Sequence, residues 1–353
     1  MIALAPAPAA AIDDAIDDAL SRIRGRADAL GEGFSELGGA IARAAAGGKR
    51  FRPALVAASF EAFGGTVADA PGLYSVAAAF ELLHTAFVVH DDVIDHDTVR
   101  RGSPNVAGEF RLRAQSRGAD ASGAALLGDA AAILAGDLLL HEACRLAALA
   151  DVGTAHRAAL LTLIDDAVFV SAAGELADVE NAVSADYADS EALLAAAHDK
   201  TAVYSFTAPL SAGAVLADAS PAAIAALSDA GRHLGLAFQL ADDLIGAFGT
   251  PDQAGRDSGG DLREAKRTPL IGLARETDAW SRVHEAISVA HTGPIAVREA
   301  QRMLDESGAR ARLVALVDES LGDARRAASD PALPPNVAEL LTTIAAKIAR
   351  RVP

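Results

Sequence analysis

The stretch ELLHTAFVVHDDVIDHDTVRRG occupies residues 81–102 and decides how the rest of the chain is interpreted. An apolar run leads into its acidic cluster, which indicates a helix buried on most sides. In such a helix Asp91 and Asp95 project from the same face, one turn apart. Like charges at this spacing repel each other. A hard divalent cation such as Mg²⁺, which binds carboxylate, water and phosphate oxygens, would offset the repulsion.

Two arginines, Arg100 and Arg101, follow this acidic cluster. Guanidinium groups are suited to bidentate binding of phosphate. Carboxylates for a metal beside arginines for phosphate predict a site for a diphosphate. The alternative for an acidic cluster taken alone is a solvated surface, but charges at the end of a buried helix need another reason.

The composition predicts an all-α protein. Of 353 residues 51% are hydrophobic but only 4% aromatic, so the core is built from Ala, Leu, Val and Ile. Alanine is the strongest helix former, and strand patterns with hairpin turns are hard to find. We find no internal repeat or long linker, which predicts one domain over residues 12–353. Residues 1–11, rich in Ala and Pro, are expected to form a disordered tail.

The charge restricts the partners. A formal charge of −17 and a pI near 4.9 argue against nucleic acid, which binds through Lys and Arg. The single cysteine, Cys144, excludes an intrachain disulfide and fits a reducing cytoplasm. No uninterrupted apolar run approaches the roughly 20 residues of a membrane span, so no transmembrane segment is expected.

Three further stretches carry groups that could bind an anion or a metal. Residues 47–53, GGKRFRP, combine glycines that admit a ligand near the backbone with three basic side chains. The alternative is an ordinary helix connection with surface charges. Asp242 and Asp243 repeat the first acidic motif, but Gly246 stands four residues after Asp242, so fewer metal ligands are expected. The glycine-rich loop 249–268 follows, and its phosphate candidates are Arg256 and Lys266.

Lys200 belongs to a helix that Pro209 should kink, because proline removes one backbone hydrogen bond and crowds another. Taken alone, Lys200 is more typical of a surface lysine whose stem lies along apolar atoms. On an earlier apolar helix, Glu175 is interpreted as a structural hydrogen-bonding residue. Asp178 could support a metal site.

Together these motifs resemble the trans-isoprenyl diphosphate synthases, the polyprenyl synthetase family of the farnesyl and geranylgeranyl type. The resemblance rests on GGKRFRP (47–53), residues 81–102, GELAD (174–178), KT (200–201) and FQLADDLIGAFG (238–249), in the family's order. It implies an all-α bundle of ten or more helices around a central cavity, a homodimer and three Mg²⁺ ions.

The resemblance also implies individual roles. Asp91 and Asp95 would bind two Mg²⁺ ions, and Asp242 the third from the facing wall. Isopentenyl diphosphate would be bound by Lys49, Arg52, His84 and Arg101. The allylic diphosphate would be bound by Arg100, Lys200, Arg256 and Lys266. Thr201 and Gln239 would face the carbocation that remains when the diphosphate departs. Gly246 and Arg256 depart from the family's usual Asp and Lys, without removing the essential charges.

The product length follows from the helix that carries Asp91. Phe87 lies one turn before Asp91 and would project into the cavity, beside the small Ala86. In this family a bulky residue there resembles short-chain enzymes, which predicts a farnesyl or geranylgeranyl product.

Three alternatives stay open from the sequence. A medium-chain or long-chain polyprenyl synthase would have the same motifs. A non-catalytic partner subunit of a heteromeric synthase would tend to lose first-cluster aspartates, whereas Asp91, Asp92 and Asp95 are all present. A terpene cyclase would lack the GGKR loop and the paired arginines. The sequence leaves the preferred allylic substrate undetermined.

Overall fold

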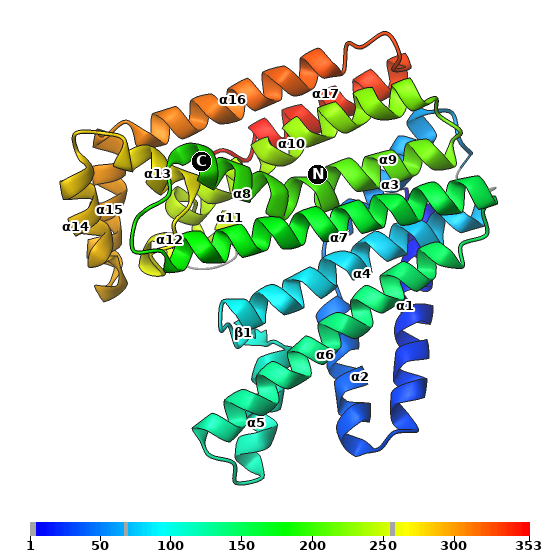
Figure 1. Ribbon diagram of the computed structural model, residues 1–353, viewed down its shortest axis with the longest axis horizontal. Coiled ribbons are helices and arrows are strands. Elements are labelled where there is room, and N and C mark those ends of the chain that lie inside the picture. Colours follow the sequence, from blue (N-terminus) through cyan, green and yellow to red (C-terminus); the bar gives the residue numbers. More distant parts are fainter. Residues whose placement is uncertain (1–4, 67–69, 255–257) are drawn as a thin grey trace. The chain divides into compact units, whose positions relative to one another are not determined.

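The computed structural model describes residues 5–66, 70–254 and 258–353 and divides into two compact units (Figure 1). The first contains residues 2–162 together with 215–217, and the second contains 163–214 and 218–353. Helices make up nearly all of the regular structure, and the described strands form one hairpin of two residues each. The predicted all-α fold class is confirmed, while the single domain stays a prediction.

The first unit is built around α4. Its elements are α1 (Pro6–Asp28), α2 (Glu32–Ala45), α3 (Phe51–Ala62), α4 (Pro71–Ile94), β1 (Val99–Arg100), β2 (Ser103–Pro104), α5 (Val106–Ser116) and α6 (Ala121–Ala148). Helix α4 packs on α6, α3 and α1, and Figure 1 shows α5 folded back along α6. Because Leu82, Leu83 and Ala86 are fully buried, α4 holds its acidic C-terminal end in a fixed place.

Helix α1 corrects the expectation of a disordered tail over residues 1–11. It begins at Pro6, so residues 6–11 are helical. Proline is tolerated in the first helical turn, where its missing N–H has no partner to lose, and the alanines that follow favour helix. Burial of Ile12 and Ile16 anchors the helix to the unit.

The second unit is built around α10. Its elements are α8 (Ser190–Ala202), η2 (Val203–Thr207), α10 (Pro221–Phe248), α11 (Pro251–Ala254), α12 (Gly260–Arg263), α13 (Pro269–Arg275), α14 (Trp280–Ser288), η3 (Ala290–Thr292), α15 (Pro294–Glu306), α16 (Ala309–Ala327) and α17 (Pro335–Ala349). Helices α7 (Thr154–Val183) and α9 (Ala208–Leu216) contribute to both units. Helix α10 packs on α16, α8 and α17, and Figure 1 shows it alongside α16.

The kink predicted at Pro209 is a short π-helical segment. The N–H of Ala208 bonds to the carbonyl of Val203, five residues back, and η2 joins α8 to α9. Proline at 209 cannot donate a hydrogen bond and its ring crowds the carbonyl four residues earlier. The wider turn before it accommodates this, and such π-helical turns are frequent at functional sites.

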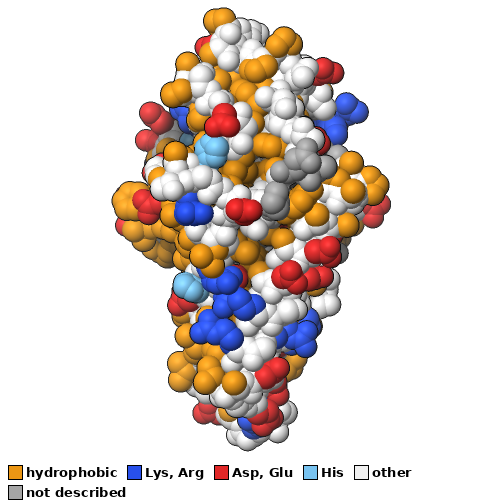
Figure 2. Space-filling view, turned by 90° about the vertical axis from the view of Figure 1, so that its right-hand side faces the viewer, with side chains coloured by type: hydrophobic (Ala, Val, Ile, Leu, Met, Phe, Trp, Pro, Cys, Tyr) orange, Lys and Arg blue, Asp and Glu red, His pale blue; other side chains and the backbone are white. Residues whose placement is uncertain are grey.

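Two helices are long and apolar enough to span a membrane by length and composition, residues 72–94 of α4 and Ala121–Ala148. In α4, 72% of the most apolar window is buried, as in the core helix of a folded protein. In α6 only 39% is buried, and Leu126, Ile133 and Leu134 are exposed. Apolar side chains also appear among the acidic ones on the face in Figure 2.

Candidate functional site

The acidic end of α4 is organised by Arg100. Asp92 is 3% exposed and accepts hydrogen bonds from Nε of Arg100 at 2.8 Å and from its Nη2 at 2.5 Å. The same Nη2 lies 3.5 Å from Oδ2 of Asp91. Burial nevertheless raises the pKa of Asp92, and Arg100 opposes that shift. Arg100, predicted to bind phosphate, therefore also pairs with a buried carboxylate, a role that its position in the sequence does not indicate.

Asp95 ends the helix as expected. Its N–H bonds to the carbonyl of Asp91 at 2.8 Å, and Asp95 is the exposed C-cap of α4. Asp91 is half-buried. The predicted pair, one turn apart at the end of a buried helix, is present.

Arg100 and Arg101 lie in a short β-hairpin, Arg100 at the end of its first strand and Arg101 in its turn. Strands β1 and β2 pair Val99 with Pro104, and the turn residues Arg101 and Gly102 have φ of 53° and 77°. Two central residues with positive φ are typical of a type I′ turn, whose twist matches the strands that it joins. Arg100 thus turns back to Asp92 from the strand, while Arg101 is exposed at the turn. No residue pattern predicts this hairpin, because strands of two residues are too short to show an alternating pattern.

Basic side chains surround His84. Burial lowers the pKa of His84 well below 6.5, and the nearby charges of Arg52, Arg100 and Arg101 lower it further. Three of the four residues predicted to bind isopentenyl diphosphate, Arg52, His84 and Arg101, therefore share one electrostatic neighbourhood. The fourth, Lys49, is exposed in the loop before α3.

Arg50 differs from its basic neighbours in the GGKRFRP motif. Its Nη1 donates to Oε1 of the buried Glu81 at 3.1 Å, and its Nε donates to Asp13 at 2.9 Å. The three basic side chains of this motif are predicted above to be phosphate donors. Arg50 is instead committed to structural carboxylates, which lie 31 and 37 residues away in the sequence.

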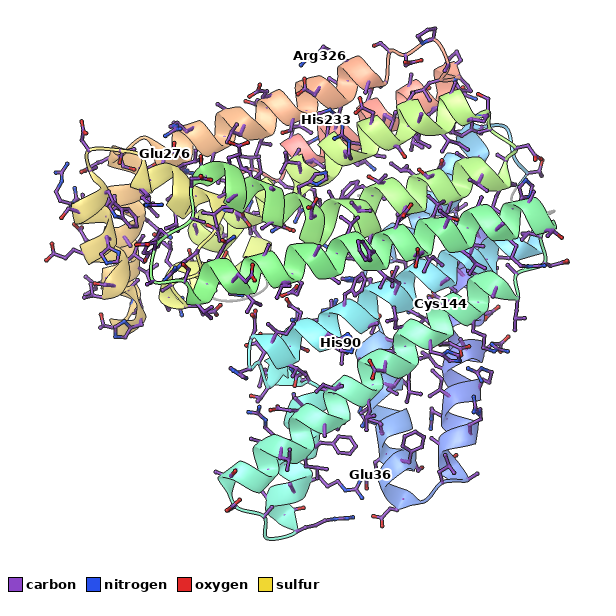
Figure 3. All side chains as sticks on the ribbon, viewed as in Figure 1. Glu36, His90, Cys144, His233, Glu276 and Arg326 are labelled. Atoms are coloured by element: carbon purple, nitrogen blue, oxygen red, sulfur yellow. The ribbon has the colours of Figure 1, made fainter. Side chains whose placement is uncertain are left out.

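His90, directly before the aspartates, lies against α6 (Figure 3). Its Nε2 is 3.4 Å from the carbonyl oxygen of Ile133 and 3.5 Å from Oδ1 of Asp137. A Cβ on Gly136 would lie 2.8 Å from Cε1 of the ring, so a larger residue there would displace the His90 ring. His90 thus holds the last turns of α4 to α6.

The predicted chain-length residues lie on the same helix. Ala86 is fully buried, and Phe87 is half-buried one turn before Asp91. Their order along α4 is as predicted, with the larger side chain partly accessible.

Helix α10 carries the second acidic motif. Asp243 is 6% exposed, and its Oδ1 accepts a hydrogen bond from Nε2 of Gln239 at 2.9 Å. Its Oδ2 has no hydrogen-bond partner among the residues that the structure describes. Burial raises the pKa of Asp243 well above its usual value, and the carboxylates of Asp261, Asp242 and Asp178 contribute. A cation placed here would be attracted by several carboxylates.

Asp242 is paired with the C-terminal segment. Its Oδ1 accepts a hydrogen bond from Nη2 of Arg351, whose guanidinium also lies 4.2 Å from the centre of the Phe238 ring. No residue pattern predicts a functional role for this segment, because 109 residues separate the two partners. Only the packing of α17 on α10 brings them together.

Lys200 is fixed by two carboxylates of α7. Its Nζ lies 3.0 Å from Oε2 of Glu175 and 2.9 Å from Oδ2 of Asp178. A Cβ on Gly174 would lie 2.6 Å from the carbonyl carbon of Asp199, so glycine lets α7 and α8 approach closely. Lys200 is thus no isolated surface lysine. Glu175 makes the structural contact that was expected, and Asp178 shares it.

Three predicted residues remain, Thr201, Lys266 and Arg256, and the two that the structure describes are half-buried or exposed. Thr201 is half-buried beside Lys200, and Lys266 is exposed, with its Nζ 3.6 Å from Oε2 of Glu264. Arg256, predicted to bind the allylic diphosphate, lies outside the described residues.

The acidic residues suit a hard cation. Within the described parts of the chain, no three His, Cys, Asp or Glu side chains converge as a ready-made metal cage. Mg²⁺ needs no such cage, since it keeps several waters and binds one or two carboxylates together with substrate phosphate. Oδ2 of Asp243, which is buried and has no hydrogen-bond partner in the described part of the chain, also fits a cation beside Asp242. Asp91, Asp95 and Asp242 are thus chemically suited to hold Mg²⁺.

Comparisons with known proteins agree with this chemistry. Residues 35–304 match the family model of the polyprenyl synthetases. The chain is 34% identical to a short chain isoprenyl diphosphate synthase of Methanothermobacter thermautotrophicus, over 70% of this chain and 69% of that protein. It is 36% identical to a (2E,6E)-farnesyl diphosphate synthase of Mycobacterium tuberculosis, over 74% of this chain and 63% of that protein. An octaprenyl diphosphate synthase of Escherichia coli is 32% identical, over 64% and 62%.

A solved structure extends the similarity to nearly the whole chain. Geranylgeranyl pyrophosphate synthase from Corynebacterium glutamicum, complexed with isoprenyl diphosphate and magnesium, has a TM-score of 0.88 at 26% identity. The alignment covers 98% of both chains. With the family model matching most of its length, this chain belongs to the polyprenyl synthetase family of trans-prenyltransferases.

Proposed function

We propose that this protein joins isopentenyl diphosphate head-to-tail to an allylic diphosphate and releases farnesyl or geranylgeranyl diphosphate. The observation that carries the proposal is the arrangement at the end of α4. There the carboxylates of Asp91 and Asp92 lie beside Arg100, and the charges of Arg52 and Arg101 act on the same histidine as Arg100 does. A diphosphate and its metal ions need these two kinds of group side by side.

Isopentenyl diphosphate would bind to Lys49, Arg52, His84 and Arg101. Each guanidinium offers up to five N–H donors in a planar fork, which matches phosphate oxygens. An anion bound among these groups would also favour the charged form of His84, which could then donate from both ring nitrogens.

The allylic diphosphate would bind to Arg100, Lys200, Arg256 and Lys266. Arg100 and Lys200 already donate to carboxylates, which hold their side chains in place. Because an ammonium has three donors and a guanidinium five, both can add a phosphate oxygen without losing these partners.

Mg²⁺, for which we propose three sites on Asp91, Asp95 and Asp242, would neutralise the charge of the departing diphosphate. The cationic side chains add to this stabilisation. The allylic C–O bond breaks and its electron pair leaves with the diphosphate. The double bond of isopentenyl diphosphate attacks the resulting carbocation and forms the new C–C bond. A proton then leaves for the released diphosphate, and a longer allylic diphosphate results.

Two side chains of the second unit would stabilise the carbocation by their dipoles. Gln239 donates its amide N–H to Asp243, so its carbonyl oxygen is left to accept or to face a positive charge. Thr201, next to Lys200, offers a hydroxyl oxygen. Neither group is a strong nucleophile, so neither would trap the cation.

The short product is supported by Phe87 and by the short-chain relatives. Phe87 would limit the space one turn below Asp91, and each isoprene unit needs close to one helical turn of about 5.4 Å. The octaprenyl relative keeps a medium or long product as the alternative.

We propose that the active form is a homodimer in the cytoplasm. On α6, Leu126, Leu127, Ile133 and Leu134 are exposed and recur at a spacing of seven residues. On α7, Phe169, Leu176 and Val183 follow the same spacing and are also exposed. Apolar stripes of this kind are typical of surfaces that a partner covers.

The proposal is tested with purified protein, labelled isopentenyl diphosphate and Mg²⁺, supplied separately with dimethylallyl, geranyl or farnesyl diphosphate. Chromatography after phosphatase treatment sizes the alcohols. Farnesol or geranylgeraniol as the longest product supports the proposal. Much longer alcohols would keep the enzyme and replace the short-chain assignment. Folded protein that elongates none of the substrates favours the non-catalytic partner subunit.

A further inference from the structure

Three residues of the loop 46–50, which joins α2 to α3, have a left-handed backbone conformation. Gly47, Gly48 and Arg50 have φ of 72°, 91° and 46°. Glycine adopts this conformation readily, whereas a residue with a Cβ is disfavoured in it. Arg50 is nevertheless the N-cap of α3, and its carbonyl accepts the N–H of Ala54 at 3.0 Å. Such a conformation persists only where surrounding contacts determine it.

The side chain of Arg50 provides these contacts. Its Nε donates to Oδ1 of Asp13 on α1 at 2.9 Å. Its Nη1 donates to the carbonyl of Ala45 at the end of α2 and to Oε1 of Glu81 on α4, both at 3.1 Å. Only 18% of the Arg50 side chain is exposed. Acceptors on three different helices fix the guanidinium, and with it the backbone of the loop.

The two carboxylates that bind Arg50 are positioned by buried structure. Glu81 is 6% exposed, and a Cβ on Gly48 would lie 3.6 Å from its Oε1, so the loop backbone also packs against this carboxylate. Asp13 is exposed, but it follows Ile12, which is fully buried, as is Ile16 one turn later. Helix α1 therefore presents the carboxylate of Asp13 to Arg50 from a fixed place.

Arg50 lies among residues predicted to bind isopentenyl diphosphate. Lys49 precedes it and Arg52 follows it by two residues. His84 follows Glu81 by three residues, about one helical turn along α4. The contact between Arg50 and Glu81 thus connects the loop that carries Lys49 to the helix that carries His84. Donors held in place before a ligand arrives bind it more tightly, because less freedom is lost on binding.

We propose that Arg50 is a positioning residue for isopentenyl diphosphate and that helix α1 supports it through Asp13. The hydrogen bonds of Arg50 hold the loop 46–50, and the loop presents Lys49 and Arg52 to the diphosphate. This inference rests on the proposed function and adds residues that do not touch the substrate themselves. Asp13 lies outside residues 35–304, so this support comes from a helix that the family model does not include.

The charges of the two carboxylates give the test its sign. Asp13 and Glu81 carry negative charge close to a proposed site for an anion. If they acted through their charge alone, removing either charge would strengthen binding of the diphosphate, because like charges repel. If they act by holding Arg50, removing either charge weakens binding. The two explanations therefore predict opposite changes in Kd.

Isothermal titration calorimetry measures binding of isopentenyl diphosphate to the full-length protein in EDTA, where neither elongation nor metal ions contribute. Asp13→Asn and Glu81→Gln keep the size of the side chain and remove its charge. We expect about 10-fold weaker binding for each, the effect of weakening one charge-assisted hydrogen bond. Asp14→Asn is the matched control, since Asp14 is also exposed but points about 100° further round α1. This control should bind at least as tightly as wild type.

A second measurement follows the loop itself. Hydrogen exchange of the Ala54 amide, which is bonded to the carbonyl of Arg50, should be faster in Asp13→Asn and Glu81→Gln than in wild type or Asp14→Asn. Arg50→Lys keeps the charge but lacks the planar fork of donors, so it should show faster exchange and weaker binding together. In steady-state assays these variants should raise KM for isopentenyl diphosphate and leave KM for the allylic diphosphate unchanged.

The outcomes separate this inference from the proposed function. Folded Asp13→Asn and Glu81→Gln proteins that bind isopentenyl diphosphate as tightly as wild type, or more tightly, would overturn the inference alone. Unchanged exchange of the Ala54 amide in both variants would also overturn it. If Glu81→Gln folds poorly, the exposed Asp13 still provides the test. Wild-type protein that binds no isopentenyl diphosphate, although the exchange responds as expected, would contradict the proposed function and not the support of the loop by Arg50.

Discussion

His84 is a residue whose surroundings oppose its charge. Burial disfavours the imidazolium, and Arg52, Arg100 and Arg101 add repulsion. Burial also disfavours the charged form of Asp92 and raises its pKa, but there Arg100 opposes the shift by donating hydrogen bonds to the carboxylate. Arg100 thus affects the pKa values of both His84 and Asp92. The positive charge gathered at this end of α4 favours binding of an anion.

The lowered pKa of His84 predicts acid sensitivity. The unfolded chain takes up a proton at this histidine below about pH 6.5, which the folded chain resists. Stability present above that pH is therefore lost as the pH falls towards the folded-state pKa, by at most about 1.4 kcal/mol per pH unit. Urea unfolding at several pH values measures the free energy of unfolding. As the pH falls below about 6.5, this free energy should decrease less for His84→Gln than for wild type. Equal losses in both proteins would contradict the assignment.

At the scale of elements, α4 combines two tasks. Its C-terminal end carries the aspartates, and the preceding turn carries the residues that would limit the product. Because Leu82, Leu83 and Ala86 are fully buried, the helix keeps the aspartates and the product-limiting residues at a fixed distance from each other. A change of side-chain size on this helix should therefore alter product length without moving the carboxylates.

Phe87→Ala should lengthen the products by at least one isoprene unit, because it removes bulk one turn below Asp91. Product sizing after phosphatase treatment provides the measurement. Val88→Ala is the matched control, since Val88 is also half-buried but points about 100° away round the helix. Unchanged products from a folded, active Phe87→Ala protein would rule out Phe87 as the limit.

Close packing of two other elements depends on Gly174. Its α-carbon lies against the backbone at Asp199 and Lys200, where α7 and α8 meet. Gly174→Ala should lower the free energy of unfolding by about 1–3 kcal/mol, because backbone must move to admit the methyl group. Gly25→Ala on α1, where nothing lies within 4 Å, should instead raise it by about 0.5–1 kcal/mol. Denaturant titration distinguishes these signs, and a neutral Gly174→Ala would show that α7 and α8 can separate without cost.

At the scale of the whole molecule, two surface properties matter, the net negative charge and the exposed apolar stripe of α6. A chain with a formal charge of −17 repels anions at long range, so its substrates depend on local groups of Lys and Arg, such as the one visible in Figure 2. The exposed apolar stripe of α6, which consists of Leu126, Leu127, Ile133 and Leu134, has no such charge and suits a second copy of the chain.

Leu134→Glu should convert the proposed dimer to a monomer, because it places a charge in the stripe of α6. Light scattering coupled to size-exclusion chromatography measures the mass. Leu30→Glu is the control, since Leu30 is a leucine after α1, outside the stripe, that is more exposed than Leu134, at 71% against 51%. A wild-type protein of monomeric mass, or a dimer that survives Leu134→Glu, would contradict this interface.

The all-α fold could be predicted, and the candidate residues could be selected, because their signals in the sequence are local. Alanine content and the pattern of apolar residues predict helices from short stretches of sequence. The four-residue spacing from Asp91 to Asp95 predicts that both side chains lie on one helix face. The hairpin and the early start of α1 were missed. Two-residue strands have no periodicity, and Pro6 resembles a loop residue as much as a first helical turn.

The sequence by itself thus determined the helices, the acidic and basic motifs and, through them, the family. Only the tertiary structure decided which charges meet: Arg50 with Glu81, Lys200 with Glu175, and Asp242 with Arg351. The same holds for Asp261, whose carboxylate fills the space beside Gly246. These partners lie on different elements, so their contact depends on how buried faces pack, which no local pattern of residues encodes.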